Sequence, residues 1–323
     1  MTSHALRNDE IAPSPTERRP RLLVSVRNAD EVHEALSGGA EWIDLKEPSS
    51  GPLGSVSPET AQAAAKETPF QIPLSAAIGE LLDWPVPDAC QLLAINRLAW
   101  LKAGLAGCVH CTDWQTRWRR MRDVLALRGK QLVMAAYVDA ERAEAPPWRD
   151  AAEFAVAEGC RYLLLDTFAK PRRHVPQSQP ASPQDRQPVE FASIATVRRA
   201  ASENRSLWDY VSDDELRRLA GSLEPQGTRL VVAGNLTQAD MARVPRQAAM
   251  IAVRGAACCN GREGVVDAGQ VEKLRRELER CFGRDSGEGG PFLDTVDESS
   301  ILGRSGTTCP RPGEAGNARC GDA

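Results

Sequence analysis

Short apolar runs recur along the chain, separated by longer and more polar stretches. The runs are rich in Leu, Val, Ile and Ala, and Gly, Pro or charged residues lie near their ends. This length and composition are typical of buried β-strands. Eight runs are expected to be strands, at 21–26, 41–46, 72–78, 98–103, 131–138, 161–166, 228–233 and 249–254.

The stretches between these runs have helical character, with apolar residues returning every three or four positions. Asn28 and Asp30 are suitable caps for the first helix, and Gly38-Gly39 is a suitable stop. The link between the third and fourth runs has the weakest helical pattern. Helices are expected at 28–37, 112–128, 148–158, 213–223 and 267–282.

Eight strands that alternate with helical or connecting segments predict a single α/β domain, a (β/α)₈ TIM barrel. About 225 residues remain once three polar segments are set aside, a compact size for a fold that typically has about 250 residues. A doubly wound open sheet is the competing fold, but it normally needs fewer strands. No G-x-G-x-x-G sequence follows the first strand, which favours the barrel.

Three segments have compositions that do not suit a folded core. Residues 1–20 are polar and contain Pro, 171–208 begins with a Pro- and Gln-rich stretch, and 284–323 is rich in Gly. Such sequences bury too little apolar surface to offset the entropy of ordering, so all three are expected to be flexible. The catalytic barrel is therefore expected within 21–283, with 171–208 as an insertion.

Charge and composition exclude several classes of protein. The net charge of −4 argues against a dedicated nucleic-acid-binding protein, which would carry a basic stripe. No apolar run approaches the roughly 20 residues of a membrane-spanning helix, and the first 20 residues contain no apolar signal core. We expect a cytoplasmic protein without membrane or nucleic-acid partners, and leave open whether it forms a homo-oligomer.

Nine cysteines raise the question of a metal site. Cys108 and Cys111 have ligand-like spacing, but no second C-x-x-C pair completes a four-ligand site. Reduced cysteines, with no metal and no cofactor, are the expected state in a cytosolic protein.

Lysine is rare in this chain: the 40 basic residues comprise 34 Arg and 6 Lys. A buried Lys can lose its proton and act as an amine nucleophile or base, whereas Arg stays charged. Active sites of TIM barrels lie at the C-terminal ends of the strands. Lys46 ends the second run, Lys102 lies near the end of the fourth, and Lys170 follows the sixth, so these three are expected to meet at one rim.

Two carboxylates accompany these lysines. Asp44 lies two residues before Lys46, so both side chains point to the same face of the strand. Asp166 ends the sixth run, four residues before Lys170. A desolvated Lys beside another cation has a lowered pKa and can form a Schiff base, which suits aldehyde or ketone substrates. Structural salt bridges inside the barrel remain the alternative interpretation.

The last two runs carry a pattern that suits phosphate binding. Gly234 and Asn235 follow the seventh run, and Arg254 and Gly255 end the eighth. The loops after these strands commonly bind phosphate in TIM barrels, and Arg can hold two phosphate oxygens at once. Ordinary turn chemistry would also explain the glycines.

Six segments together resemble the (5-formylfuran-3-yl)methyl phosphate synthase family. The resemblance extends from about Arg21 to Phe282, without 171–208, and its most specific part is D-x-K-x-P…G-x-L-G, Asp44 to Gly54. The segments are LLVSVRNADEVHEALSGGAEWIDLKEPSSGPLG, PLSAAIGE, WLKAGL, LLLDTFAK, VVAGNL and AVRGAACCNGREGVVD.

This resemblance implies a (β/α)₈ lyase of methanofuran biosynthesis. It implies the condensation of two glyceraldehyde 3-phosphate molecules to 4-(hydroxymethyl)-2-furancarboxaldehyde phosphate, with loss of phosphate and water. By resemblance, Lys46 matches the Schiff-base lysine and Lys102 the proton-accepting lysine. Asp44, Asp166 and Lys170 match further active-site positions.

The sequence departs from the family pattern at three places. Glu80 stands where the third-strand motif usually has Asp, Asn235 stands where Ser is expected, and a Pro-rich segment follows Lys170. Two other hypotheses stay open: a Schiff-base aldolase that acts on another sugar phosphate, and a non-catalytic barrel that serves as a scaffold.

Overall fold

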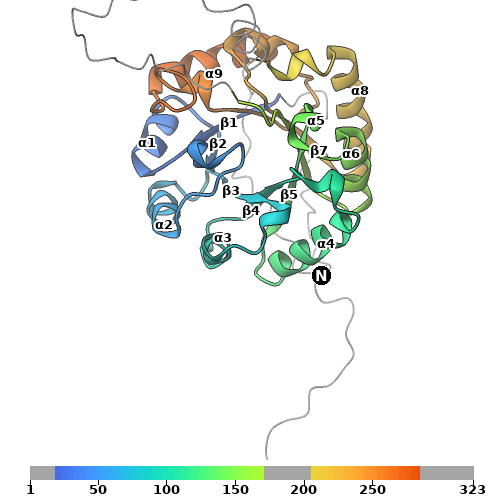
Figure 1. Ribbon diagram of the computed structural model, residues 1–323. Coiled ribbons are helices and arrows are strands. Elements are labelled where there is room, and N and C mark those ends of the chain that lie inside the picture. Colours follow the sequence, from blue (N-terminus) through green and yellow to red (C-terminus); the bar gives the residue numbers. More distant parts are fainter. Residues whose placement is uncertain (1–18, 171–204, 284–323) are drawn as a thin grey trace, which may run out of the picture. The chain divides into compact units, whose positions relative to one another are not determined.

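The computed structural model describes residues 19–170 and 205–283, which form a closed barrel of eight parallel strands in sequence order (Figure 1). The predicted barrel is confirmed, and each strand lies within two residues of its predicted bounds. The strands are β1 (Arg21–Val26), β2 (Trp42–Leu45), β3 (Leu74–Glu80), β4 (Trp100–Gly104), β5 (Gln131–Tyr137), β6 (Tyr162–Asp166), β7 (Arg229–Val232) and β8 (Met250–Val253).

The helices surround the strands as an outer ring (Figure 1). The α-helices are α1 (Ala29–Ser37), α2 (Pro58–Glu67), α3 (Pro87–Leu92), α4 (Trp114–Ala126), α5 (Ala140–Ala143), α6 (Trp148–Ala157), α8 (Asp213–Leu223) and α9 (Ala268–Phe282). Short 3₁₀ helices complete the connections: η2 (Pro48–Ser50), η3 (Leu81–Asp83), η4 (Cys108–His110), η5 (Leu207–Asp209), η6 (Glu224–Gln226), η7 (Gln238–Arg243) and η8 (Gly255–Ala257).

The five predicted helices are all present. Asn28 caps α1, because its side chain accepts a hydrogen bond from the backbone of Glu31, and Gly38 ends the helix. Asp30 lies inside the first turn instead of capping it. The link with the weakest helical pattern contains only η3 and the six-residue α3.

The interior of the barrel is layered along the even-numbered strands. Trp42, Trp100 and Tyr162 pack together near the beginning of β2, β4 and β6, with ring centroids 4.8 to 6.0 Å apart. Because side chains alternate along a strand, the inward positions that follow are Asp44 on β2 and Lys102 on β4. The aromatic layer therefore closes the barrel below the charged residues.

The ends of the barrel domain differ slightly from the predicted ones. Leu207, inside the predicted insertion, is fully buried and its N–H donates to the carbonyl of Gly234 at 2.9 Å. Arg19, inside the predicted extension, forms a salt bridge with Glu41 at 2.9 Å. Residues 1–18, 171–204 and 284–323 of the segments expected to be flexible lie outside the described residues. Among the helices that the structure describes, none is long and apolar enough to cross a membrane.

Candidate active site

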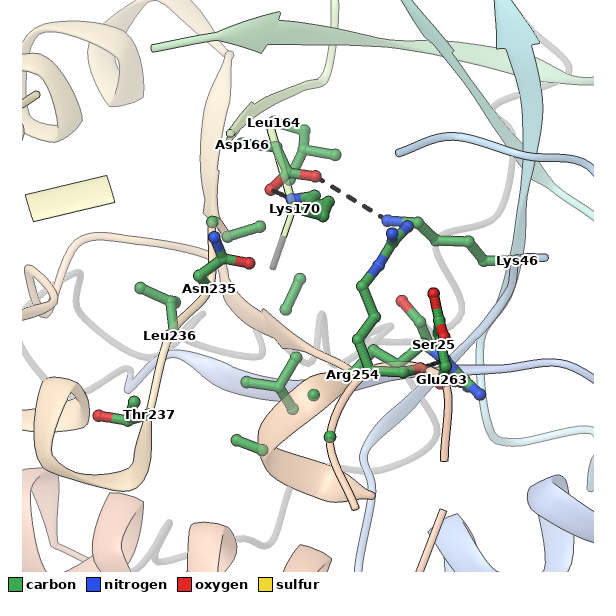
Figure 2. A pocket seen from close by; sticks show the side chains of 18 of the residues that line it. Ser25, Lys46, Leu164, Asp166, Lys170, Asn235, Leu236, Thr237, Arg254 and Glu263 are labelled. Atoms are coloured by element: carbon green, nitrogen blue, oxygen red, sulfur yellow. Dashed lines mark hydrogen bonds and ion pairs between the residues drawn. The ribbon is translucent and has the colours of Figure 1, made fainter. Parts of the chain in front are cut away.

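A cavity of about 450 Å³ lies at the C-terminal ends of the strands (Figure 2). Its wall contains every predicted site residue except Asp44, which is fully buried beneath it. The even-numbered strands supply the amines, and the loops after β7 and β8 supply the opposite wall. The predicted residues that line the cavity are Lys46, Lys102, Asp166, Lys170, Gly234, Asn235, Arg254 and Gly255.

Asp44 holds Lys102 at the floor of this cavity. The Lys102 Nζ lies 2.5 Å from the Asp44 Oδ2, and both residues are buried. The Ser25 hydroxyl donates to the same carboxylate oxygen at 3.0 Å, and the Ser75 hydroxyl donates to Oδ1 at 2.7 Å. A buried carboxylate with three donors is fully paired, so its position and that of Lys102 are well defined.

Asp166 is shared by two amines. The Lys46 Nζ lies 3.9 Å from the Asp166 Oδ2, and the Lys170 Nζ bonds to Oδ1 (Figure 2). Lys170 also donates to the Thr167 hydroxyl at 3.2 Å, and the Thr167 N–H donates to Asp166 at 2.8 Å. The amines come from different strand ends and converge on one carboxylate.

The surroundings lower the pKa of Lys46 to about 7. Burial is the main cause, Asp166 opposes it, and the positive charges of Lys170, Arg262 and Lys102 lower the value further. Burial likewise lowers the pKa of Lys170. Although burial alone would raise the pKa of Asp166, the charges of Lys170 and Lys46 bring it below its ordinary value. A pKa near 7 allows a sizeable fraction of Lys46 to be neutral near neutral pH, and the neutral amine is the form that can attack a carbonyl.

The residues after Lys46 explain the G-x-L-G part of the motif. Pro48 begins η2, and the chain turns at Gly51, whose φ of 108° favours glycine. The Leu53 carbonyl accepts the N–H of Gly79 at 2.9 Å. A Cβ on Gly54 would lie 2.2 Å from the Glu47 carbonyl, so only glycine fits there. The motif thus folds a compact loop that supports the β2 end.

The loop after β7 approaches the end of β6 closely. Gly234 has a φ of 108°, and a Cβ there would meet Thr167 at 3.1 Å. Asn235 adopts a left-handed φ of 54°, which Asn tolerates better than most residues. Its side-chain amide donates to the Arg205 carbonyl at 2.6 Å. Phosphate binding by Gly234 and Asn235 stays a prediction.

Arg254 lines the cavity, but all five of its N–H groups donate to protein oxygens. Nη1 and Nη2 bond the Glu31 carboxylate at 2.8 and 3.2 Å, and Nη1 also bonds the Ser25 carbonyl at 2.9 Å. Nε and Nη2 bond the carbonyls of Arg262 and Gly264 at 2.8 and 3.1 Å. Phosphate binding by Arg254 would have to replace one of these bonds, and Gly255 simply begins η8.

Two further residues form a pair near Lys46: Tyr137, which is buried, and Glu80, which is partly buried. The sequence marked Glu80 only as a departure from the family pattern and did not point to Tyr137. The Tyr137 hydroxyl donates to Glu80 at 2.6 Å, and the Ala106 N–H donates to the other Glu80 oxygen at 3.0 Å. Burial raises the pKa of Glu80 and, more strongly, that of Tyr137. Gly104 makes room for the pair, since a Cβ there would lie 2.1 Å from Glu80. The unusual Glu of the third-strand motif was the signal for this pair.

Asp139 supports the turn that carries Lys170. Its carboxylate accepts the N–H of Phe168 at 2.6 Å and that of Ala169 at 2.9 Å. Because Asp139 is buried, these charge-assisted bonds fix the backbone just before Lys170. No sequence pattern pointed to this residue.

The cysteines with ligand-like spacing lie apart from the amines of the cavity. Cys108 is fully buried, and burial raises the pKa of its thiol to about 12. The Cys111 thiol donates to Asp113 at 3.0 Å. Within residues 19–170 and 205–283, no group of three or more His, Cys, Asp and Glu side chains is arranged to hold a metal ion.

The chain is similar to known proteins over most of its length. The profile of the 4-HFC-P synthase family matches residues 22–184 and 189–275. The (5-formylfuran-3-yl)methyl phosphate synthase of Methanopyrus kandleri is 27% identical over 267 residues, which cover 80% of this chain and 99% of that protein. The enzyme of the same name from Methanocaldococcus jannaschii is 25% identical, covering 79% and 97%.

A comparison of folds supports the barrel. The octameric ribulose-1,5-bisphosphate carboxylase/oxygenase of Pyrococcus horikoshii superposes with a TM-score of 0.50 at 13% identity, covering 82% of this chain and 59% of that one. At this identity the likeness concerns the fold alone. The family profile covers well over half of the chain and spans all eight strands. The chain therefore belongs to the 4-HFC-P synthase family, a family of lyase-type enzymes.

Proposed function

We propose that this enzyme condenses two molecules of glyceraldehyde 3-phosphate to 4-(hydroxymethyl)-2-furancarboxaldehyde phosphate, as a step of methanofuran-type cofactor biosynthesis. The observation that carries the proposal is Lys46, a buried amine with a pKa of about 7 at the edge of a charged cavity. The family match and the names of the relatives support this choice of product.

Lys46 begins the reaction as the nucleophile. Its neutral amine adds to the aldehyde of one triose phosphate and, after loss of water, leaves an imine. Asp166, which is paired with both Lys46 and Lys170, stabilises the positive charge that develops on the imine nitrogen. Lys170 donates the proton that allows the former aldehyde oxygen to leave as water.

Lys102 acts on carbon in the following step. Once it has given up its own proton to solvent, its neutral amine takes a proton from the carbon next to the imine, and Asp44 stabilises the ammonium that forms again. The enamine adds to the aldehyde of the second triose phosphate and forms the carbon–carbon bond. Loss of one phosphate and water, with release of Lys46, gives the aromatic furan; overall one phosphate and two waters leave.

Borohydride trapping tests the covalent step. Protein incubated with glyceraldehyde 3-phosphate and borohydride should gain the mass of one reduced triose phosphate, and peptide mapping should place it on Lys46. The matched control is Lys66→Arg, an exposed lysine on α2. Full activity of a protein that never yields an adduct would contradict the mechanism.

Product analysis separates this proposal from a related Schiff-base aldolase. The proposed reaction gives a furan with strong ultraviolet absorbance and one released phosphate. An adduct on Lys46 without a furan product would instead indicate an aldolase that acts on another sugar phosphate. A protein with neither property would fit a scaffold role.

A further inference from the structure

Arg262 enters the cavity from the loop between η8 and α9. It is partly buried, and its Nη2 donates to the carbonyl of Gly51 at 2.8 Å. Gly51 belongs to the loop that follows Lys46. Arg262 therefore connects the last loop of the barrel to the loop of the most specific sequence motif.

The other basic side chains of the cavity each lie within 4.0 Å of a carboxylate, whereas Arg262 does not. Lys102 pairs with Asp44, Lys46 and Lys170 share Asp166, and Arg254 pairs with Glu31. Among the described residues, no carboxylate oxygen lies within 4.0 Å of the Arg262 guanidinium. Asp166, Glu263 and Glu47 act on Arg262 only from a longer distance. A partly buried cation without an anion in contact is costly unless a ligand supplies the negative charge.

The free donors of Arg262 are available to such a ligand. A guanidinium has five N–H groups, and the described residues provide an acceptor for the one that bonds Gly51. None of its nitrogen atoms is both buried and without a hydrogen-bond partner, so the remaining donors are open to the cavity. Burial lowers the pKa of Arg262 without neutralising it, because an arginine keeps its charge in proteins.

The geometry points to Arg262 as a substrate-binding residue that holds the phosphate of the sugar phosphate whose aldehyde reacts with Lys46. This inference rests on the proposed function and assigns its phosphate contact to a residue outside the predicted set. A phosphate dianion balances the unpaired charge, and the planar guanidinium matches its oxygens. Arg254, by contrast, has no free N–H group to offer.

The inferred contact also positions the nucleophile. The positive charge of Arg262 lowers the pKa of both Lys46 and Lys170, so it lies close enough to act on the amines. Bound phosphate would neutralise that charge and, through the Gly51 contact, hold the loop that follows Lys46. A triose is short, so its aldehyde and phosphate must both be accommodated in this one cavity.

The test uses two substitutions of the full chain, Arg262→Gln and Arg262→Lys. Gln keeps an N–H donor for Gly51 but removes the positive charge. Lys keeps the charge but lacks the planar, paired N–H donors of the guanidinium. The control is Arg276→Gln, an exposed arginine on α9 that pairs with Glu272. Calorimetry measures the affinity for inorganic phosphate, and steady-state kinetics measure KM for glyceraldehyde 3-phosphate.

We expect Arg262→Gln to weaken phosphate binding and to raise KM by about 10- to 100-fold, since it removes charge-assisted hydrogen bonds. Arg262→Lys should recover part of the loss, and Arg276→Gln should behave as wild type. Borohydride trapping of non-phosphorylated glyceraldehyde is measured at about pH 9, where we expect Lys46 to be mostly neutral in every variant. The yield of the trapped adduct should differ from the wild-type yield by less than about threefold.

Two outcomes would overturn the inference. Unchanged phosphate affinity in Arg262→Gln would show that Arg262 does not bind phosphate. If Arg262→Gln lowered the trapping yield with non-phosphorylated glyceraldehyde as much as it lowered phosphate affinity, Arg262 would only hold the Gly51 loop in place. If Arg262→Gln fails to fold, Arg262→Lys is the deciding variant. Wild-type phosphate affinity and KM in that variant would contradict a phosphate contact through the paired N–H groups of the guanidinium. Absence of a furan product would contradict the proposed function and leave the phosphate result standing.

Discussion

Asp44 and Asp166 are both buried carboxylates at the mouth of one barrel, yet they treat their lysines differently. Asp44 serves one amine and is completed by the hydroxyls of Ser25 and Ser75. Asp166 is divided between Lys46 and Lys170, and its contact with Lys46 is a loose 3.9 Å. Two ammonium groups around one carboxylate leave an excess of positive charge, which favours the loss of a proton from one of them. The shared carboxylate is therefore the part of the site that produces a neutral nucleophile.

The largest effect is expected from removing that nucleophile. Lys46→Met should lower kcat by at least about 10³-fold, because no other amine can form the imine at the same place. The folded state should persist, since Asp166 keeps its bond to Lys170. Furan formation at saturating substrate measures the change, and Lys66→Met is the control for loss of an exposed lysine. Activity within tenfold of wild type would move the nucleophile to another residue.

Asp166→Asn removes the shared carboxylate and should have the second largest effect. It leaves two amines without a counter-ion, so the free energy of unfolding at pH 7 should fall by about 3 kcal/mol. The activity should fall by about 10²-fold, as the developing imine charge loses its partner. Urea denaturation and steady-state rates measure these changes. Asp214→Asn, in an exposed pair with Arg217, is the control and should change the stability by less than about 1 kcal/mol.

Asp166→Asn should also change the pH dependence in a defined direction. Asp166 raises the pKa of Lys46, so its loss should move the rising limb of the pH–rate profile below the wild-type position near pH 7. A limb that stays in place would mean that Asp166 does not act on the ionisation of Lys46.

Lys170→Met is expected to shift the same limb the other way. Lys170 lowers the pKa of Lys46 through its positive charge, and it competes for Asp166. Without Lys170, Lys46 should keep its proton up to a higher pH. The rising limb of the kcat/KM profile should therefore shift to higher pH by on the order of one pH unit. Profiles of kcat/KM between pH 5 and pH 10 test this, with Lys273→Met on α9 as the control. A shift to lower pH would exclude charge repulsion as the cause.

The same comparison shows which features the sequence could predict. That Asp44 and Lys46 point to the same face, and that both lie with Lys102 at one rim, follows from strand periodicity and from the rule that active sites lie at strand ends. The pairing of Asp44 with Lys102 is seen only in the structure. The strands themselves were predictable for another reason: a strand that is buried on both faces appears in the sequence as a continuous apolar run. Lys46, Asp166 and Lys170 were found in this way, and the family resemblance then assigned roles to them.

Arg262 and Asp139 could not be found in this way. Arg262 lies in a polar loop, where Asn260 and Gly261 both turn with positive φ, and no periodicity applies there. Its contact with Gly51 joins positions 211 residues apart in the chain. Arg254 carried the stronger sequence signal, but its pairing with Glu31 depends on how the start of α1 meets the residue that follows β8. Contacts between distant loops are set by the tertiary fold, which local patterns do not encode.

The smallest effects are expected from the hydroxyls that complete Asp44, and they test whether its single amine needs such support. Ser25→Ala removes one hydrogen bond, which should cost about 1 kcal/mol of unfolding free energy and change kcat by only a few-fold. Ser75→Ala should cost more, because the Ser75 hydroxyl also accepts the indole N–H of Trp42 at 3.1 Å. Urea denaturation of the two variants side by side measures the difference. Because Lys102 stays paired with Asp44 in both variants, neither should shift the rising limb of the pH–rate profile that reports the ionisation of Lys46. A shift in either variant would mean that Asp44 and Asp166 are electrostatically coupled and do not act separately.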